Sequence, residues 1–300
     1  MYSGIIIIEK EAGFTSHDVV AKLRGICGQR KIGHTGTLDP EATGVLPVCL
    51  GSATKLCDML TDRDKEYEAE LLLGVETDTQ DTTGEVLARS PVEVSEAEVR
   101  RVCESFIGEY AQVPPMYSAL KVNGKKLYEL AREGKEVERK PRNVIIHELE
   151  ILKCSLPIVK LRVQCSKGTY IRTLCADIGA KLGCGGAMQS LRRTAVGSFR
   201  REEALTLGEV QQKKDAGRLE EIIRPVDSVF ESCPMLHIGR EYGGLLENGN
   251  AIAPDQTAEG GLYEPDRWVR FYRQDDSFAG IYAYNREKRK YMPVKMFLDR

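Results

Sequence analysis

The segment GHTGTLDPEATG, residues 33–44, is the most informative stretch of this 300-residue sequence about its fold. Gly33, Gly36 and Gly44 frame a loop that can adopt backbone angles closed to other residues, and Pro40 confines Asp39 to an extended backbone. Residues 45–50, VLPVCL, then have the apolar composition of a core strand. We therefore expect a stiff loop that holds the Asp39 carboxylate still, directly ahead of a strand.

Three other interpretations of this loop remain open from its residues alone. An Asp followed by Pro is also a common helix cap with proline at the first helical position, and the dipeptide by itself favours that role. A phosphate-binding loop fits less well, because the glycines lack the terminal Gly-Lys-Ser/Thr of that motif. A metal site on His34 and Asp39 lacks a third ligand in view.

Elements expected around the loop alternate between strands and helices. Apolar side chains at positions 67, 69, 71 and 73 alternate with the glutamates at 66, 68 and 70, so Tyr67 should point inward from a half-buried strand. The capping-box sequence beginning at Ser95 predicts an amphipathic helix. Other predicted strands are residues 5–8, 144–152 and 159–165, and other predicted helices begin at Ser16, after Thr169 and at Leu207, ending near Gly28, Gly183 and Leu219.

A second polar run, SKGTYIR at residues 166–172, follows directly after a predicted core strand. Arg172 can pair with a carboxylate through two hydrogen bonds, and Tyr170 can stack on a ring or donate a hydrogen bond. On these residues alone, a strand-to-helix junction with a structural salt bridge explains the run equally well.

Charge is distributed unevenly along the chain, although the net charge is only -2. Residues 57–110 carry fifteen acidic against five basic side chains, whereas residues 121–142 carry eight basic against four acidic ones. A basic segment can match a phosphate backbone even in a slightly acidic protein. By charge alone, a solvated helix face with ion pairs is the better explanation. Pro114, Pro115 and the turn at residues 123–124 predict that residues 113–142 form a surface arm.

The nine cysteines and four histidines give no metal or redox signature. The closest two cysteines in sequence, Cys49 and Cys57, are eight positions apart, and no Cys-x-x-Cys pair exists. We expect reduced thiols, no metal and no cofactor. The apolar run at residues 5–8 is far shorter than a signal-peptide core or a membrane span, so we expect a cytoplasmic protein without membrane contact.

Several separated motifs occur in the order found in one enzyme family: GHTGTLDPEATGVLPVCLG (33–51), KEY (65–67), VPPMYSALKVNGKKLYELAREG (113–134), CSKGTYIRTL (165–174) and LRR (191–193). Over roughly the first 230 residues the chain resembles the bacterial TruB-type tRNA pseudouridine(55) synthases. The resemblance implies an α+β pseudouridine-synthase fold, with a mixed, mainly antiparallel central sheet and flanking helices. It implies a catalytic domain at residues 1–230, with an RNA-binding arm at 113–142. Residues 231–300 are more loosely similar to a small PUA-like, RNA-binding β-barrel.

The resemblance also assigns roles by position. It makes Asp39 the catalytic carboxylate, Tyr67 the tyrosine that stacks on the target base, and Arg172 the partner of the aspartate. The implied substrate-binding residues are His34, which helps hold the opened T-loop, Tyr170 and Leu191, which line the base pocket, and Lys10. The implied RNA-binding side chains of the arm are Lys121, Lys125, Lys126, Arg132 and Arg142. One departure is Glu11, where the family usually has proline after the lysine, which affects the stiffness of the first loop.

The implied reaction is the isomerisation of uridine to pseudouridine at position 55 in the T-loop of tRNA. A positioned carboxylate acts as the nucleophile, at the base or at the sugar, on a flipped-out base, and no cofactor is needed. The expected partner is the T-arm of tRNA, bound by a monomer that requires no protein partner. Two alternatives remain: an RNA-binding or tRNA-folding module without essential catalysis, and a guide-RNA-dependent pseudouridine synthase.

Overall fold

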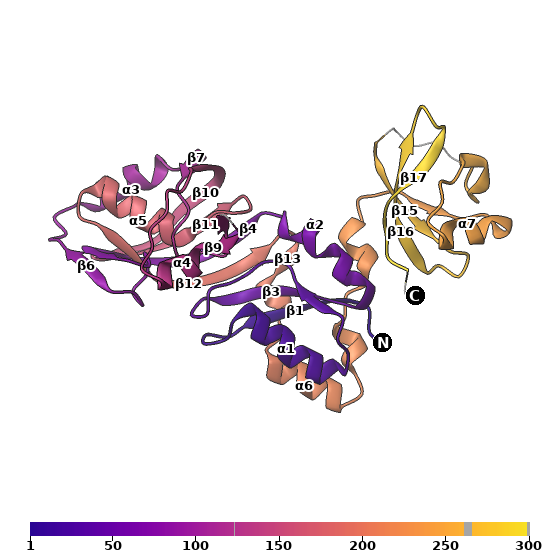
Figure 1. Ribbon diagram of the computed structural model, residues 1–300, viewed down its shortest axis with the longest axis horizontal. Helices are drawn as coiled ribbons and strands as arrows, with labels where there is room; N and C mark the ends of the chain where they lie inside the picture. The colour runs from indigo at the N-terminus through magenta and orange to yellow at the C-terminus, as the bar shows by residue number, and fades with distance from the viewer. Residues whose placement is uncertain (123, 261–265, 299–300) are drawn as a thin grey trace.

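The computed structural model describes residues 1–122, 124–260 and 266–298, and within them its largest feature is a mixed sheet of nine strands (Figure 1). The strands follow the order β1-β3-β12-β4-β11-β10-β7, with β2 beside β3 and β13 beside β12. Pairings along this path are antiparallel except that of β12 with β3, which is parallel. The expected α+β fold with a mixed, mainly antiparallel sheet is therefore confirmed. The strands of this sheet are β1 (Gly4–Lys10), β2 (Ile32–His34), β3 (Thr43–Leu50), β4 (Lys65–Leu73), β7 (Gly108–Gln112), β10 (Arg142–Ser155), β11 (Ile158–Cys165), β12 (Gly186–Val196) and β13 (Phe199–Arg200).

Helices cover the sheet in two groups, and each group closes a separate part of the core. Helices α1 and α6 pack against β1 and β3, whereas α3 and α5 pack against the half of the sheet built from β4, β11 and β10. The α-helices are α1 (Ser16–Cys27), α2 (Cys57–Thr61), α3 (Glu96–Glu104), α4 (Leu127–Arg132), α5 (Ile171–Leu182), α6 (Leu207–Asp215) and α7 (Gly243–Glu247). Short 3-10 helices are η1 (Gly51–Leu56), η2 (Arg201–Glu203), η3 (Leu219–Ile222), η4 (Val226–Phe230), η5 (Arg240–Tyr242) and η6 (Pro254–Gln256).

Local signals in the sequence set most helix ends. Helix α3 has the expected capping box at Ser95, and α1 and α5 end at Gly28 and Gly183, both in the left-handed conformation. Helix α1 begins at Ser16 as predicted, with Thr15 as its N-cap. The last predicted helix is shorter than expected: α6 ends at Asp215, and the chain turns through a left-handed glycine before η3.

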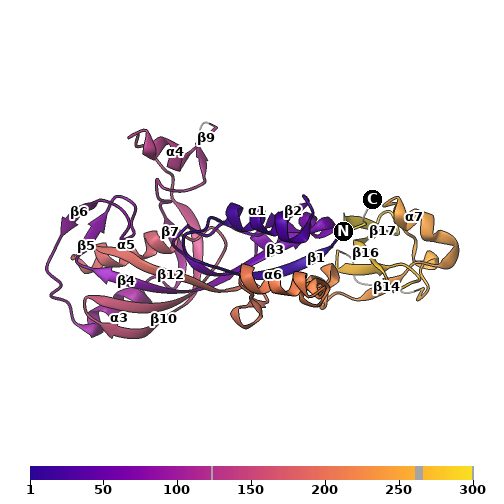
Figure 2. The same ribbon diagram turned by 90° about the horizontal axis from the view of Figure 1, so that it is seen from below.

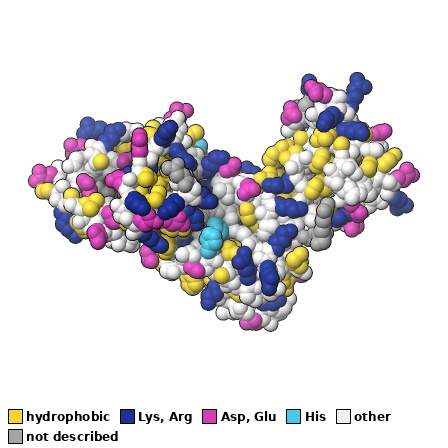
Figure 3. Space-filling view, in the orientation of Figure 1, with side chains coloured by type: hydrophobic (Ala, Val, Ile, Leu, Met, Phe, Trp, Pro, Cys, Tyr) yellow, Lys and Arg dark blue, Asp and Glu magenta, His cyan; other side chains and the backbone are white. Residues whose placement is uncertain are grey.

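The C-terminal body is a four-stranded sheet with its own apolar core. Its strands are β14 (Met235–His237), β15 (Trp268–Tyr272), β16 (Phe278–Asn285) and β17 (Lys290–Met296), paired in that order. Within the described residues this sheet does not close on itself, so the expected PUA-like barrel is not confirmed. Phe278 and Phe297 pack with Phe230 in a core cluster that also contains residues of β1 and β3. The two bodies are therefore joined by an apolar contact, beside a notch that Figure 3 shows between them.

Residues 113–142 leave the sheet between β7 and β10 and project from the body, as Figure 2 shows. The projection contains the strands β8 (Lys121–Val122) and β9 (Lys125–Lys126), which pair with each other, and helix α4. Asn123, in the predicted turn between the two strands, lies outside the described residues. The prediction of a surface arm agrees with this arrangement. A separate two-stranded sheet, β5 (Val75–Thr77) with β6 (Val86–Arg89), frames a turn at residues 77–86.

Candidate active site

Asp39 lies in the loop between β2 and β3, and no helix follows it. The chain instead makes a turn, in which the Ala42 amide donates to the Asp39 carbonyl at 3.1 Å, and then enters β3. The helix-cap interpretation of Asp39 and Pro40 is therefore wrong. Leu38 and Ala42, on either side of the acid, are buried in the core around β4, and the Leu38 amide donates to Ser16 Oγ at 2.9 Å. These anchors leave Asp39 at the surface of a fixed loop.

The buried side chain of Lys10 anchors this loop through hydrogen bonds. Its ammonium is fully buried and donates to the carbonyls of Glu11, Phe14 and Pro40, at 3.0, 2.6 and 2.9 Å. Burial lowers the pKa of Lys10. All three of its donors are engaged, so Lys10 ties the first loop to the residue that follows Asp39. The bond to the Glu11 carbonyl also restrains the position where the family usually has proline; direct contact of Lys10 with substrate stays a prediction.

The Asp39 carboxylate is paired with Arg172, at the first turn of α5. Arg172 Nε lies 3.0 Å from Asp39 Oδ2, and Nη2 lies 3.4 Å from Oδ1. The two side chains differ in exposure, at 7% for Arg172 and 42% for Asp39. A two-bond pair with a guanidinium orients the carboxylate. One side of the carboxylate is therefore fixed by protein while the other remains accessible.

Arg172 is itself held by the turn at residues 77–86 and by the base of the arm. Its Nη1 donates to the Thr79 carbonyl at 3.1 Å and lies 3.6 Å from Asp81 Oδ2, and its Nη2 donates to the Tyr117 carbonyl at 2.9 Å. The Asp81 side chain is only 16% exposed, and it accepts from the Thr83 amide at 3.0 Å. Sequence reasoning missed Asp81. The signal that could have found it is an acid inside the polar run TDTQDTTG, residues 77–84.

Tyr67 points inward from β4, as its alternating strand predicts, and is only 8% exposed. It lies in the same core cluster as Leu38 and Ala42, which flank Asp39. Burial raises the pKa of the Tyr67 phenol. Leu191, on the neighbouring strand β12, is half-buried and packs against this cluster. The structure therefore brings Tyr67 and Leu191 to the part of the core that supports the Asp39 loop.

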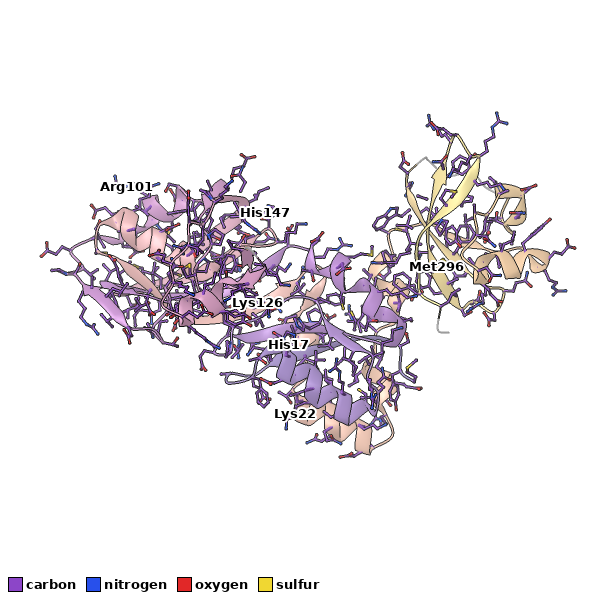
Figure 4. All side chains as sticks on the ribbon, in the orientation of Figure 1. His17, Lys22, Arg101, Lys126, His147 and Met296 are labelled. Carbon is purple, nitrogen blue, oxygen red and sulfur yellow. The ribbon has the colours of Figure 1, made fainter. Side chains whose placement is uncertain are left out.

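Tyr170 and His34 lie at the ends of elements that border the loop. Tyr170 precedes α5, and the Gln112 side chain holds its backbone by accepting from the amide at 2.8 Å and donating to the carbonyl at 3.0 Å. Burial raises the pKa of the Tyr170 phenol and lowers that of His34. The His34 ring meets that of His17, marked in Figure 4, edge to face with centroids 5.0 Å apart. His34 stands at the start of the loop that carries Asp39.

The basic side chains of the arm lie on its surface. Figure 3 shows basic and acidic side chains mixed over the left part of the molecule, which carries the arm. Lys125 pairs with Glu133 at 3.3 Å, while Lys126 and Arg132 lie over the Tyr128 ring. Lys121 and Arg142 are exposed. The ion pairs expected for a solvated face are thus present, and exposed cations remain beside them.

The described part of the chain contains no group of three or more His, Cys, Asp or Glu side chains that could hold a metal ion. All nine cysteines are free thiols.

Among the described helices, none is long and apolar enough to cross a membrane. The site thus contains an oriented, accessible Asp39 carboxylate, next to the core cluster that includes Tyr67.

Two family models match consecutive parts of the chain. Residues 24–171 match the N-terminal domain of the TruB family of pseudouridylate synthases, and residues 172–231 match the C-terminal domain of tRNA pseudouridylate synthase B. The motifs around Asp39, Tyr67 and the arm fall within the first match, and Arg172 begins the second.

Relatives of known name cover nearly the whole chain. A tRNA pseudouridine synthase B of Lachnoclostridium phytofermentans is 53% identical, over 99% of this chain and 100% of its own length. One from Bacillus pumilus is 40% identical, over 99% and 98%. Among solved structures, a Cbf5-Nop10-Gar1 complex contains a chain that is similar with a TM-score of 0.74 and 28% identity, over 99% of this chain and 85% of its own. By its sequence over almost its full length, the chain belongs to the TruB family of pseudouridylate synthases.

Proposed function

We propose that this protein isomerises the uridine at position 55 in the T-loop of tRNA to pseudouridine, with Asp39 as the catalytic carboxylate. The observation that carries the proposal is the Asp39–Arg172 pair, in which a buried guanidinium orients a carboxylate that stays 42% exposed. The relatives named above are tRNA pseudouridine synthases, which supports tRNA as the substrate class.

The reaction needs no external group, because it only rearranges one nucleotide. The bond between uracil N1 and ribose C1′ breaks, the base turns, and C5 bonds to C1′ while the C5 proton leaves and N1 gains a proton. Asp39 attacks the base or the sugar to form a covalent intermediate that keeps the base in the site. Tyr67 stacks on the extruded ring, which offsets part of the cost of unstacking the base from the T-loop.

The surroundings of Asp39 fit this chemistry. Lys10, through the Pro40 carbonyl, and Arg172 hold the carboxylate loop at two points, so little reorganisation is needed when the nucleophile attacks. Tyr170 and Leu191 are proposed to line the pocket for the flipped base, and His34 is proposed to help hold the opened T-loop. Residues 1–230 are proposed to form the catalytic domain, and residues 231–300 an additional RNA-binding domain.

RNA recognition is proposed to depend on backbone shape and phosphates, since side chains cannot read the deep groove of an RNA helix. The proposed phosphate contacts are Lys121, Lys125, Lys126, Arg132 and Arg142. We further propose that the protein acts on tRNA in the cytoplasm as a monomer, without a protein partner. The guide-RNA-dependent alternative draws on the similarity to a chain of an H/ACA RNP bound to a substrate RNA. The projecting arm argues for direct recognition of tRNA.

The direct test uses purified protein with a bare transcript of the T stem and loop, and with a copy in which the target uridine is replaced by cytidine. Carbodiimide-induced stops of reverse transcription should appear at position 55 of the first transcript only, with no added protein or guide RNA. Product formed only after a guide RNA is added would replace the proposal with the guide-dependent alternative. Wild-type tRNA maturation in cells that carry an Asp39→Asn protein would favour the RNA-folding module. Size-exclusion chromatography of the same sample checks the monomer.

Removing two exposed cations from the arm should weaken RNA binding without affecting the chemical step. For Lys121→Ala/Lys125→Ala, we expect the Kd for T-arm RNA to rise by about three- to tenfold and the slope of log K against log salt to fall by about 1 to 2. The rate at saturating RNA should change less than about twofold, because neither side chain belongs to the site around Asp39. Filter binding at several salt concentrations and single-turnover assays measure the two effects.

The matched control removes two cations from α3, which Figure 2 shows on the side of the body away from the arm. Arg100→Ala/Arg101→Ala changes the net charge by the same amount, and both side chains are exposed. Equal losses of affinity in the two double variants would mean that the arm contributes only through overall charge.

A further inference from the structure

Arg193, on β12, is the largest of the fully buried side chains in the described part of the protein, with 1% exposure. A buried guanidinium normally pairs with a carboxylate, because removing its charge from water is costly. Within the described residues no Asp or Glu lies in ion-pair distance of Arg193. Burial lowers the pKa of this guanidinium. Among the described residues, Arg193 is therefore a core cation without a carboxylate partner.

The neighbours of Arg193 are neutral oxygens from the catalytic loop, β3 and β4. Its Nε donates to the Val45 carbonyl at 2.7 Å and its Nη2 reaches the Gly36 carbonyl at 3.4 Å. On β4, the residue directly opposite is Tyr67, so the two side chains lie side by side, and the positive charge of the guanidinium acts to lower the pKa of the Tyr67 phenol. One side chain therefore connects the loop that carries Asp39 with the tyrosine beneath it.

The backbone reinforces this connection. Gly44 closes the Asp39 loop and pairs with Arg193 across the parallel contact of β3 and β12. A Cβ atom at Gly44 would lie 2.1 Å from the Arg193 carbonyl oxygen, and its φ of +107° is unfavourable for other residues. Only glycine allows the two strands to approach this closely. The loop thus meets Arg193 near its start, through Gly36, and at its end, through Gly44.

We infer that Arg193 is a positioning residue of the site, which holds the Tyr67 hydroxyl and the Asp39 loop in one fixed arrangement. The inference rests on the proposed function, because it treats Tyr67 as the residue beneath the flipped base. In this inference the Tyr67 oxygen accepts from Arg193, because a guanidinium only donates, and the phenol proton is directed elsewhere. Arg193 thereby sets both the place of the ring and the direction in which its hydroxyl can donate.

The charges around Tyr67 agree with this role. Burial raises the pKa of the phenol, and Cys165 on β11 and Asp39 in the loop raise it further. Arg193 acts against these effects, because a nearby cation favours the phenolate. Loss of the guanidinium should therefore move any ionisation of Tyr67 that affects turnover to higher pH.

A double-mutant cycle between Arg193 and the Tyr67 hydroxyl tests the inference. For Arg193→Met, we expect the single-turnover rate to fall by about 10- to 100-fold with an unchanged Kd for RNA, and Arg193→Lys should restore part of the rate. In a Tyr67→Phe background, Arg193→Met should cost less than about threefold more, because the hydroxyl is already gone. If Arg193→Met lowered the single-turnover rate by the same factor in the wild-type and Tyr67→Phe proteins, the inference would be overturned. Arg193 would then be only a structural residue.

A matched control and a second measurement keep the outcomes separate. Arg192→Lys changes the adjacent residue, whose half-exposed side chain pairs with Glu9 at 3.2 Å, and should alter the rate less than about twofold. If Arg193→Met does not fold, the same cycle is run with Arg193→Lys. The midpoint of thermal unfolding is also measured for the two single variants and the double variant. A shift in the double variant that differs from the sum of the single shifts supports the contact between Arg193 and Tyr67, whereas additive shifts contradict it. Wild-type protein that makes no pseudouridine would refute the proposed function, whereas the unfolding cycle would still report on Arg193.

Discussion

Asp39→Asn is expected to lower pseudouridine formation on T-arm RNA by on the order of 10⁴-fold or more, because an amide cannot replace a carboxylate as nucleophile. Asn has almost the same shape, and its amide oxygen can still accept from Arg172, so the loop should keep its structure. The Kd for RNA should stay within about twofold, since one uncharged substitution removes no phosphate contact. Single-turnover assays, filter binding and thermal unfolding measure these three quantities.

The same exchange at Asp215, an exposed acid at the end of α6, is the control and should leave the rate unchanged. Residual turnover of Asp39→Asn within about tenfold of wild type would falsify the assignment of Asp39 as nucleophile. Mass spectrometry should confirm that the amide of Asn is intact before any small residual rate is interpreted.

The second-largest effect is expected for Arg172→Lys. Lysine keeps the positive charge but cannot form two parallel bonds to a carboxylate or reach the Thr79 and Tyr117 carbonyls at the same time. The 7% exposure of Arg172 means that water cannot replace the lost bonds. We expect the single-turnover rate to fall by about 10² to 10³-fold and the free energy of unfolding to drop by about 2 to 3 kcal/mol.

Arg100→Lys provides the comparison, because Arg100 forms an exposed ion pair with Glu96 on α3 and should tolerate the same exchange. Rate measurements at saturating RNA, together with chemical denaturation, separate the two effects. If Arg172→Lys destabilised the protein but retained the wild-type rate, Arg172 would be a structural link between α5 and the turn at residues 77–86, and the orientation of Asp39 would need another source.

Much of the local structure was predictable from the sequence because its causes are local. Alternation along residues 67–73 depends on the period of a strand, so the inward direction of Tyr67 followed without knowledge of its neighbours. The Ser95 capping box and the glycine after α5 act through hydrogen bonds between residues a few positions apart. The same approach failed at Asp39 and Pro40, where a local pattern suits both a cap and a turn.

The composition of the site could be expected only with the aid of a family resemblance, because its partners are distant in sequence. Asp39 and Arg172 are 133 positions apart, and they meet because β2, β3 and α5 bring their ends together. Asp81 joins them from a turn whose polar residues have no distinctive period. Contacts of this kind depend on strand order and helix placement, which residue patterns do not specify.

By itself, the sequence determined several core strands, most helix ends and the residue types that can carry the chemistry, since these follow from short-range periodicity and hydrogen bonding. The tertiary structure alone decided that Asp39 caps no helix, that the C-terminal sheet stays open within the described residues, and that Arg193 is buried opposite Tyr67. The physical reason is that burial and pairing are set by register between distant strands, where a shift of one residue would turn Tyr67 and Arg193 to the other face of the sheet.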